Sequence, residues 1–384
     1  MNVVEPPPSR ATRVPGNLTR QLANRAMGRD DLIALWFGEP DVPTPEFICQ
    51  AATEALARGE TFYTEGLGRN YLRQGIADYL SRTHRVDMSA ERIAVTVSAG
   101  NALNLAFQCL LNEGDTVVTT CPAFPNLLSI PAMQGAVVRT VPLQATEAGW
   151  QLDMEQLLHV ARGAKVILIN SPNNPTGWMM PRQQMQQLIQ ACRANGTWLL
   201  SDEVYSRLCF DGQAAPSLLE FAEDEERLIV VNSFSKAWAM TGWRLGWLTM
   251  PRSLMPTLER IMEFSVSCAP AFAQRAGAVA LSQGEAFIRS QNERYARNLA
   301  LVQSRFAAMP RIEFPTPQAT FYAYFRIAGV SDNLQFAQRL IDEANVGIAP
   351  GIAFDPQAKD WYRICFAKSA ERLSQGLDRI EACL

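Results

Sequence analysis

Histidine is nearly absent from this sequence: the 384 residues contain only His84 and His159. Neither lies in a motif, so a hydrolase with a histidine base or a metal site with histidine ligands is not expected. The sequence also lacks a C-x-x-C pair, because its eight cysteines are scattered singly. Single cysteines in apolar segments are typical of free thiols in a reducing compartment, and they predict a cytoplasmic protein.

Long runs of apolar residues or of basic residues are missing as well. No apolar run is long enough to span a bilayer, and no long basic run accompanies the net charge of −3. Nucleic acid and anionic membrane are therefore not expected as partners. The first sixteen residues, MNVVEPPPSRATRVPG, are proline-rich and charged rather than apolar. This is not the pattern of a signal peptide, and it predicts a flexible arm.

Short β-branched runs are abundant, and helical patterns separate them. Continuous runs of this kind, bounded by turn residues, suit strands that are buried on both faces of a parallel-rich sheet. The alternation predicts a doubly wound α/β domain over residues 46–281. The runs that predict strands are RIAVTVS (92–98), DTVVTTC (115–121), AVVRTVPL (136–143), KVILIN (165–170), TWLLSDEVY (197–205) and RLIVVNSFS (227–235).

The sequence changes character after residue 281. A long charged helical pattern over 285–309 leads into the strand-like 311–327 and a second helical pattern over 333–346. These patterns predict a smaller α+β domain over residues 282–384. Residues 1–45 are expected to supply the arm and a further part of the small domain.

Chemically useful residues follow the predicted strands, at the sheet edge where open α/β sheets bind ligands. Ser98, Ala99 and Gly100 open a helix, and the N–H groups of a helix N-terminus favour an anion. The same three residues also suit an ordinary strand-to-helix turn. The turn SPNNPTG (171–177) is rigid, and its asparagine side chains can donate outward.

Three charged residues continue this pattern. Asp202 follows a strand expected to be central, where a carboxylate is costly without a cation or donor, although a capping role is the alternative. Lys236 becomes a nucleophile and base if it is desolvated, but a lysine that reaches the surface is the alternative. Arg244 fits either an anion site or a structural ion pair. Together these groups match the needs of pyridoxal 5'-phosphate: an amine, a carboxylate for the ring nitrogen and a phosphate site.

The chain resembles the class I/II aminotransferases, which are fold-type I pyridoxal-phosphate enzymes. The resemblance implies a large domain with a mostly parallel seven-stranded sheet between helices, plus a smaller α+β domain. It also implies a transaminase that moves an amino group between an L-amino acid and a 2-oxo acid by a ping-pong mechanism. The motifs that carry it are GEPDVPTP (38–45), NSPNNPTG (170–177), SDEVY (201–205), SFSKAWAMTGWRLGW (233–247), PGIAF (350–354) and YRICFA (362–367).

The resemblance implies a role for each matched residue around the ring. Lys236 would form the Schiff base with the cofactor and carry the proton between the substrate Cα and C4′. Asp202 would pair with the pyridinium nitrogen. Tyr205 and Asn174 would hydrogen-bond the ring's O3′, and Phe124 would stack on the ring.

The phosphate and the substrate have their own matched residues. Ser98, Ala99 and Gly100 would give the phosphate backbone or hydroxyl donors, with Ser233 and Arg244 completing the cup. The substrate α-carboxylate would meet a bidentate guanidinium, near a glycine loop and the turn asparagine. The residues implied for this substrate site are Arg363, Gly38 and Asn174.

Tyr63, in the segment TFYTEGLG, matches a tyrosine that reaches the phosphate of the neighbouring subunit. The resemblance therefore implies a homodimer with shared sites. The alternative for Tyr63 is an aromatic residue of the core beside a helix.

Several alternatives stay open at the level of sequence. A pyridoxal-phosphate C–S β-lyase shares the fold, and a catalytically silent ligand-binding relative shares the cofactor site. A nicotinamide dehydrogenase has little support, because GLGRN (66–70) is only a fragment of a glycine fingerprint. Trp36, Phe37 and Leu67 suggest an apolar or aromatic substrate side chain. A dicarboxylic substrate needs a second cation, and the sequence places none.

Overall fold

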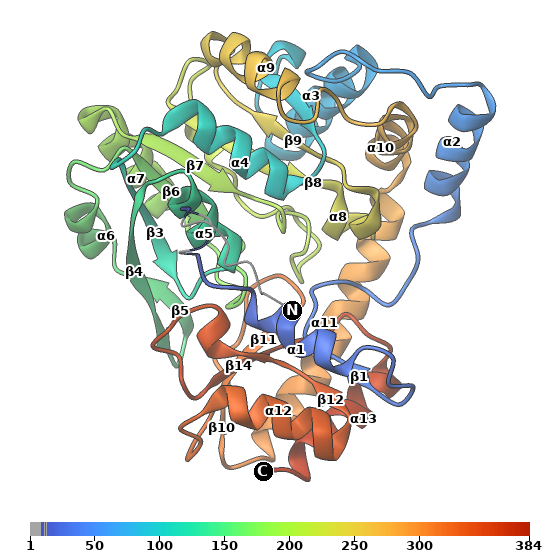
Figure 1. Ribbon diagram of the computed structural model, residues 1–384, viewed down its shortest axis with the longest axis vertical. Helices are drawn as coiled ribbons and strands as arrows, with labels where there is room; N and C mark the ends of the chain where they lie inside the picture. Colours follow the sequence, from blue (N-terminus) through green and yellow to red (C-terminus); the bar gives the residue numbers. More distant parts are fainter. Residues whose placement is uncertain (1–8, 11, 13) are drawn as a thin grey trace, which may run out of the picture.

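The computed structural model describes residues 9, 10, 12 and 14–384. Residues 1–8, 11 and 13, which hold most of the predicted flexible arm, lie outside the described residues. The strands of the described part form an eight-stranded sheet, a four-stranded sheet and a two-stranded pair. Figure 1 shows the large sheet and its helices above the two smaller sheets, with the long helix α11 (Glu285–Ala307) running between them.

The large sheet confirms the predicted mostly parallel arrangement. Its order is β2-β9-β8-β7-β6-β3-β4-β5, and the neighbours from β8 through β4 are parallel. It has eight strands rather than seven, because β5 extends the edge by an antiparallel hairpin with β4. The strands are β2 (Ile93–Thr96), β3 (Thr116–Cys121), β4 (Val137–Thr146), β5 (Gly149–Leu152), β6 (Val166–Asn170), β7 (Trp198–Asp202), β8 (Leu228–Ser233) and β9 (Gly246–Thr249).

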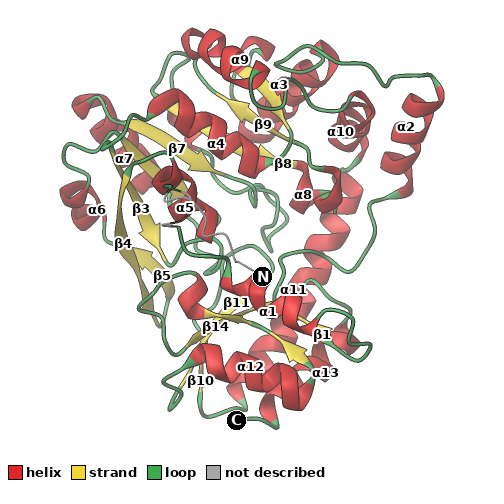
Figure 2. Cartoon of the chain, viewed as in Figure 1, coloured by secondary structure: helices red, strands yellow, loops and turns green. Residues whose placement is uncertain are grey.

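Both faces of the central strands of the large sheet are buried, as the β-branched runs predict, whereas β4 near the edge is largely exposed. In β6, Val166 and Leu168 pack into one hydrophobic cluster, whereas Ile167 and Ile169 pack into another on the opposite face. Helices lie on both sides of the sheet (Figure 2). They include α2 (Glu46–Ala57), α3 (Asn70–His84), α4 (Ala99–Leu110), α5 (Pro125–Met133), α6 (Met154–Val160), α7 (Arg182–Asn195), α9 (Met255–Glu263) and α10 (Ala271–Gln283).

The remaining strands lie at the other end of the molecule. The four-stranded sheet has the antiparallel order β10-β11-β14-β13, and β1 pairs in parallel with β12. That last pair joins residues 33–34 to residues 346–347, which supports the small-domain assignment of the segment before residue 46. The boundaries at 45 and 281 stay predictions. The strands are β1 (Ile33–Ala34), β10 (Ile312–Glu313), β11 (Tyr322–Ile327), β12 (Val346–Gly347), β13 (Ala349–Pro350) and β14 (Trp361–Cys365), with helices α12 (Asn333–Ala344) and α13 (Ala370–Glu381).

The first helix, α1 (Leu18–Ala26), lies beside the small sheet (Figure 1). It begins at Asn17, whose side chain accepts the Arg20 N–H at 2.9 Å as an N-cap. Arg25 and, just beyond the helix, Arg29 form ion pairs with Asp342 of α12, at 3.1 and 3.0 Å. These contacts fix the helix to α12. Across residues 9, 10, 12 and 14–384, no helix is both long and apolar enough to cross a membrane.

Candidate active site

A cavity of about 640 Å³ lies at the carboxyl ends of the parallel strands. Asn170, Asp202 and Ser233 are the last residues of β6, β7 and β8, so the parallel sheet brings all three to one edge. Tyr322 of β11 and Arg363 of β14 line the same cavity from the small sheet. The sequence-predicted residues that line it are Gly38, Ala99, Gly100, Phe124, Asn174, Asp202, Tyr205, Ser233, Lys236, Arg244 and Arg363.

Lys236 stands on the short helix α8 (Phe234–Ala237), which follows β8 directly. The Ser233 hydroxyl caps this helix by accepting the Ser235 N–H at 3.1 Å. The Lys236 Nζ donates to the Gly38 carbonyl at 2.7 Å and lies 5.8 Å from the centre of the Tyr205 ring. Burial lowers the pKa of Lys236 to about 8, so roughly a tenth of the amine is neutral at pH 7, far more than for an ordinary lysine. The amine therefore lies in the cavity, not at the protein surface.

Asp202 is buried at the end of β7. Burial raises the pKa of its carboxyl to about 7, although the Val204 N–H bound to Oδ1 at 3.2 Å favours the charged form. Within the described part of the chain, no cationic side chain lies within 4 Å of the Asp202 carboxylate. A buried carboxylate in this setting is stabilised by a ligand that presents a cation or a proton donor.

A chain of hydrogen bonds links the two sides of the cavity. The Tyr205 hydroxyl lies 2.8 Å from the Tyr322 hydroxyl and accepts a long contact, 3.4 Å, from the Asn174 amide. The Asn174 oxygen accepts Nη1 of Arg363 at 2.7 Å. A Cβ built on Gly38 would lie 1.6 Å from the Tyr322 hydroxyl, so only glycine fits there. Asn174 therefore connects the Tyr205 side of the cavity with the Arg363 side.

Arg363 is a buried guanidinium with 4% of its surface exposed. Nη1 donates to Asn174 and Nη2 to the Trp36 carbonyl, while Nε is buried without a hydrogen-bond partner. The guanidinium lies 4.3 and 4.6 Å from the centres of the Tyr322 and Phe354 rings. It is thus held rigidly between two aromatic rings, and no carboxylate of the described residues pairs with it. Such a group is suited to a carboxylate ligand.

The opposite end of the cavity is suited to a phosphate. The first N–H groups of α4, at Ala99 and Gly100, have no partner within the helix and face the cavity. Ser98 is not among the lining residues, because its hydroxyl accepts the Asn101 N–H at 3.1 Å and caps α4. Gly246 of β9 allows the N-terminus of α4 to lie close to that strand, because a Cβ at this position would lie only 3.0 Å from the Ala99 nitrogen.

Arg244 completes this end. It adopts a left-handed backbone conformation with φ of 53°, which is uncommon for a residue other than glycine, and donates from Nη1 to the Thr241 carbonyl at 2.7 Å. Within the described residues it has no carboxylate partner. Ser233 lines the same end and contacts the Leu245 carbonyl at 3.4 Å.

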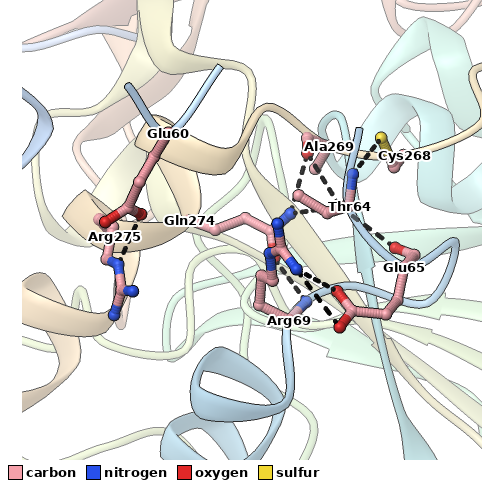
Figure 3. Close-up of polar contacts among 8 residues, drawn as sticks. All are labelled: Glu60, Thr64, Glu65, Arg69, Cys268, Ala269, Gln274 and Arg275. Atoms are coloured by element: carbon pink, nitrogen blue, oxygen red, sulfur yellow. Dashed lines mark hydrogen bonds and ion pairs between the residues drawn. The ribbon is translucent and has the colours of Figure 1, made fainter. Parts of the chain in front are cut away.

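Tyr63 is not brought into this cavity. Its side chain is 86% exposed, beside Phe62 at 81%, so the alternative of a core aromatic does not hold. A hydrogen-bond network braces the segment that carries Tyr63 against α10 (Figure 3). At its centre Gln274 donates to Thr64 Oγ1 at 3.0 Å and to the Ala269 carbonyl at 2.8 Å, and accepts the Arg69 N–H at 2.8 Å. The tyrosine is therefore displayed outward by a well-held loop.

Several cavity residues were not predicted from sequence. Ser235 lies one position before Lys236, so the lysine motif carried a signal for it. Trp36 and Leu67, suggested as entrance residues, belong to the hydrophobic clusters instead, whereas Phe37 does line the cavity. Glu39 and Thr241 lie within quoted motifs but were given no role there, whereas Arg20 and Tyr322 lie outside every motif.

The donor set fits pyridoxal 5'-phosphate. Asp202 is a buried acid that needs a cationic or donor partner, α4 and Arg244 form an anion site, and Lys236 supplies an amine of lowered pKa. An α/β fold with this set at its strand ends defines the class of pyridoxal-phosphate enzymes that are built on a mostly parallel sheet.

Comparison with known proteins narrows this class. The sequence profile of the family Aminotransferase class I and II matches residues 30–380. The chain is 33% identical to aspartate aminotransferase of Thermotoga maritima over 97% of each protein, and 34% identical to an arginine–pyruvate transaminase of Pseudomonas aeruginosa over 95% of this chain and 92% of that protein. The solved structure of Thermus thermophilus aspartate aminotransferase with maleate has a TM-score of 0.92 and 30% identity, covering 99% of this chain and 100% of that one.

The chain belongs to the class I and II aminotransferase family. The predicted fold, the predicted enzyme class and the predicted cofactor are confirmed: it is a pyridoxal-phosphate-dependent aminotransferase. The substrates of this family are amino acids and 2-oxo acids.

Proposed function

We propose that this cavity carries out ping-pong transamination, with the α-carboxylate of the L-amino acid on Arg363 and with Lys236 as the proton-transferring base. The observation that carries the proposal is the Arg363 guanidinium, which is buried, fixed by Asn174 and by two rings, and free of any carboxylate within the described residues. A rigid fork of this kind orients an amino acid and aims its Cα at the interior of the cavity.

Lys236 has the properties of a base at that position. Bound pyridoxal phosphate supplies an aldehyde carbon for the amino group and a ring that accepts electrons from Cα. The Lys236 amine, held on the Gly38 carbonyl, takes the Cα proton and returns a proton as the reaction proceeds. Its pKa of about 8 lies close to working pH, where a general base is most effective. We assign the Schiff-base role to the same amine.

The cofactor would be held at several points. Asp202 would pair with the protonated ring nitrogen, which removes the cost of its isolated burial. Tyr205 and Asn174 would hydrogen-bond the ring hydroxyl, and Phe124 would cover a ring face. The phosphate would be bound by a set that the described structure gathers at one end of the cavity: Ala99, Gly100, Ser233, Ser235 and Arg244.

The substrate side chain is not fixed by the relatives, because two that match about equally well are named for aspartate and for arginine, which carry opposite charges. A panel of amino donors and 2-oxo acid acceptors, with both products quantified, tests the proposal. We expect a new amino acid in equal amount to the 2-oxo acid released. Release of ammonia and a 2-oxo acid without a new amino acid would instead identify a β-lyase.

Arg363→Gln provides the matching variant. Loss of the bidentate contact should lower kcat/KM about 10- to 100-fold for every amino donor, whatever its side chain. The cofactor should remain bound, because Arg363 is placed at the substrate end. A variant that loses the cofactor instead would contradict this assignment.

We also propose that two copies pair, so that Tyr63 of each reaches the phosphate end of the other's cavity. The support is the outward display of Phe62 and Tyr63 on a braced loop, and an exposed Phe264 in the segment after α9. Exposed aromatic residues grouped in this way are typical of protein interfaces. A cytoplasmic location stays a prediction, supported by eight free thiols in the described residues.

A further inference from the structure

One cation in the active-site cavity has no part in the chemistry described above. The charged residues that line the cavity are Arg20, Glu39, Asp202, Lys236, Arg244 and Arg363. Lys236 and Asp202 serve the ring. Arg244 is assigned to the phosphate, and Arg363 to the α-carboxylate. These two arginines account for the two anions that every substrate complex contains, so the Arg20 guanidinium remains.

The position of Arg20 differs from that of the other arginines near α1. Arg25 and Arg29 pair with Asp342 and fix α1 to α12. Arg20 lies in the first turn of α1 and faces the cavity, where its guanidinium lies 4.4 Å from the centre of the Phe37 ring. No carboxylate in the described part of the chain pairs with it. The helix is thus anchored by two arginines and presents the third to the substrate space.

We propose that Arg20 binds the distal carboxylate of a dicarboxylic amino acid of four or five carbons and of the matching dicarboxylic 2-oxo acid. This inference rests on the proposed transamination. A substrate of this class has two carboxylates, and the cavity offers each a guanidinium, Arg363 at the buried end and Arg20 on α1. Stacking on Phe37 holds the Arg20 plane in place, and its charge persists at every working pH.

Glu39 is the acidic side chain that could instead select a cationic substrate. Its carboxylate, however, already accepts the Thr241 hydroxyl at 3.3 Å. Thr241 in turn gives its carbonyl to Arg244 at 2.7 Å. Glu39 is therefore bound to the phosphate end of the cavity, whereas the Arg20 guanidinium makes no hydrogen bond or ion pair with any described residue. This difference favours an anionic substrate side chain over a cationic one.

The test compares aspartate with asparagine, and glutamate with glutamine, because each pair differs only in the distal charge. We expect the wild-type enzyme to favour the acid in kcat/KM. In Arg20→Gln the ratio of acid to amide should fall at least about tenfold, mainly through the acid. Arg25→Gln, which removes a charge from the same helix outside the cavity, should leave the ratio within about twofold.

Binding of a non-reacting ligand gives a second readout. Succinate should shift the wild-type holoenzyme's thermal unfolding upward and compete with substrate, and propionate should do so much less. Arg20→Gln should lose this advantage of succinate, and Arg20→Lys should keep part of it. These measurements remain informative if Arg20→Gln folds poorly.

Two results would overturn the inference. One is a wild-type enzyme that turns over the amides as efficiently as the acids. The other is an Arg20→Gln variant that slows acids and amides equally, which would mean that Arg20 only shapes α1. Both differ from failure of the proposed function, in which no amino donor of any charge would yield a new amino acid.

Discussion

The two key ionisable side chains of the site, Lys236 and Asp202, both have pKa values that burial moves toward neutrality, in opposite directions. Each is a poor choice for stability alone, because an isolated charge in an apolar setting is costly. Each side chain becomes useful when a ligand supplies the charged or hydrogen-bonding partner that it lacks.

Lys236→Ala should abolish turnover, by at least about 10³-fold, because no other amine lines the described cavity. The visible absorption of lysine-bound cofactor should vanish with it. Thermal unfolding should stay close to wild type, since the removed amine makes a single hydrogen bond. Lys359→Ala, an exposed lysine far along the chain, serves as the control. Turnover within tenfold of wild type would contradict the role of Lys236.

Asp202→Asn should stabilise the cofactor-free chain at pH 8 while removing most activity. The folded-state pKa of Asp202 is raised, so its protonated form contributes stability below pH 4, and this contribution is lost as pH rises toward 7. The variant cannot ionise, so its advantage over wild type should grow between pH 5 and 8, by about 2–3 kcal/mol. Urea unfolding of both proteins at pH 5 and at pH 8 measures this difference in the free energy of unfolding.

The exposed Asp78→Asn serves as the control for this experiment. It should change the stability little, and equally at pH 5 and 8. If Asp202→Asn gains no stability over wild type between these values, the Asp202 carboxyl is not held at a raised pKa in the cofactor-free chain.

At the scale of elements, α10 controls the loop that displays Tyr63. Gln274→Leu removes the two hydrogen bonds that tie α10 to Thr64 in this loop and to Arg69 at the start of α3, and a third to the Ala269 carbonyl just before α10. We expect a loss of about 2–4 kcal/mol in the free energy of unfolding, because the freed buried groups find no other partner. Chemical denaturation measures it. Gln283→Leu, exposed at the end of the same helix, should cost almost nothing, and an equal loss in both variants would contradict the role of the network.

The central parallel strands β6, β7 and β8 were predictable from sequence, because both of their faces are buried and all but their last one or two residues are apolar. β6, β7 and β8 each fall inside a predicted run. The short strands β5 and β9 were missed. Each has four residues that begin with glycine and include at most one β-branched side chain, unlike the equally short but predicted β2 (IAVT), and each is joined to its neighbours by antiparallel pairing. A short segment that becomes a strand only by pairing with a neighbouring strand has little local pattern from which it can be predicted.

The same limit applies to the site. Lys236, Asp202, Asn174 and Arg363 lie in motifs, so sequence alone placed them in one cavity. Tyr322 begins the apolar strand β11, which carries no motif, and only the packing of the small sheet against the segment after β7 brings its hydroxyl to Tyr205. Arg20 lies just after a segment interpreted as a flexible arm. Its approach to the cavity depends on how α1 packs against the small sheet.

At the scale of the whole molecule, pairing of two copies predicts that separately damaged chains repair one another. Tyr63→Ala chains should bind the cofactor about tenfold more weakly, through loss of one phosphate contact. Mixed with Lys236→Ala chains, they should form hybrids in which an intact Tyr63 completes the cavity that retains Lys236. Cofactor affinity at the working cavities of isolated hybrids should then match wild type.

The size of the assembly provides the second measurement. Sedimentation of the wild-type protein should give twice the chain mass of 42.6 kDa. Hybrids whose cofactor affinity equals that of the Tyr63→Ala protein would show that Tyr63 acts within its own chain, or not at all.

The order of the cavity residues along the chain has a consequence for synthesis. The groups that one chain gives to the cofactor in its own cavity lie between Ala99 and Arg244, whereas Arg363 belongs to β14, which is synthesised after all of them. β14 lies between β11 and β13, so the small sheet cannot close before that strand arrives. A growing chain therefore carries its own cofactor contacts before it has the clamp for a substrate. Loading with cofactor can precede the synthesis of β14, but catalysis must wait for that strand.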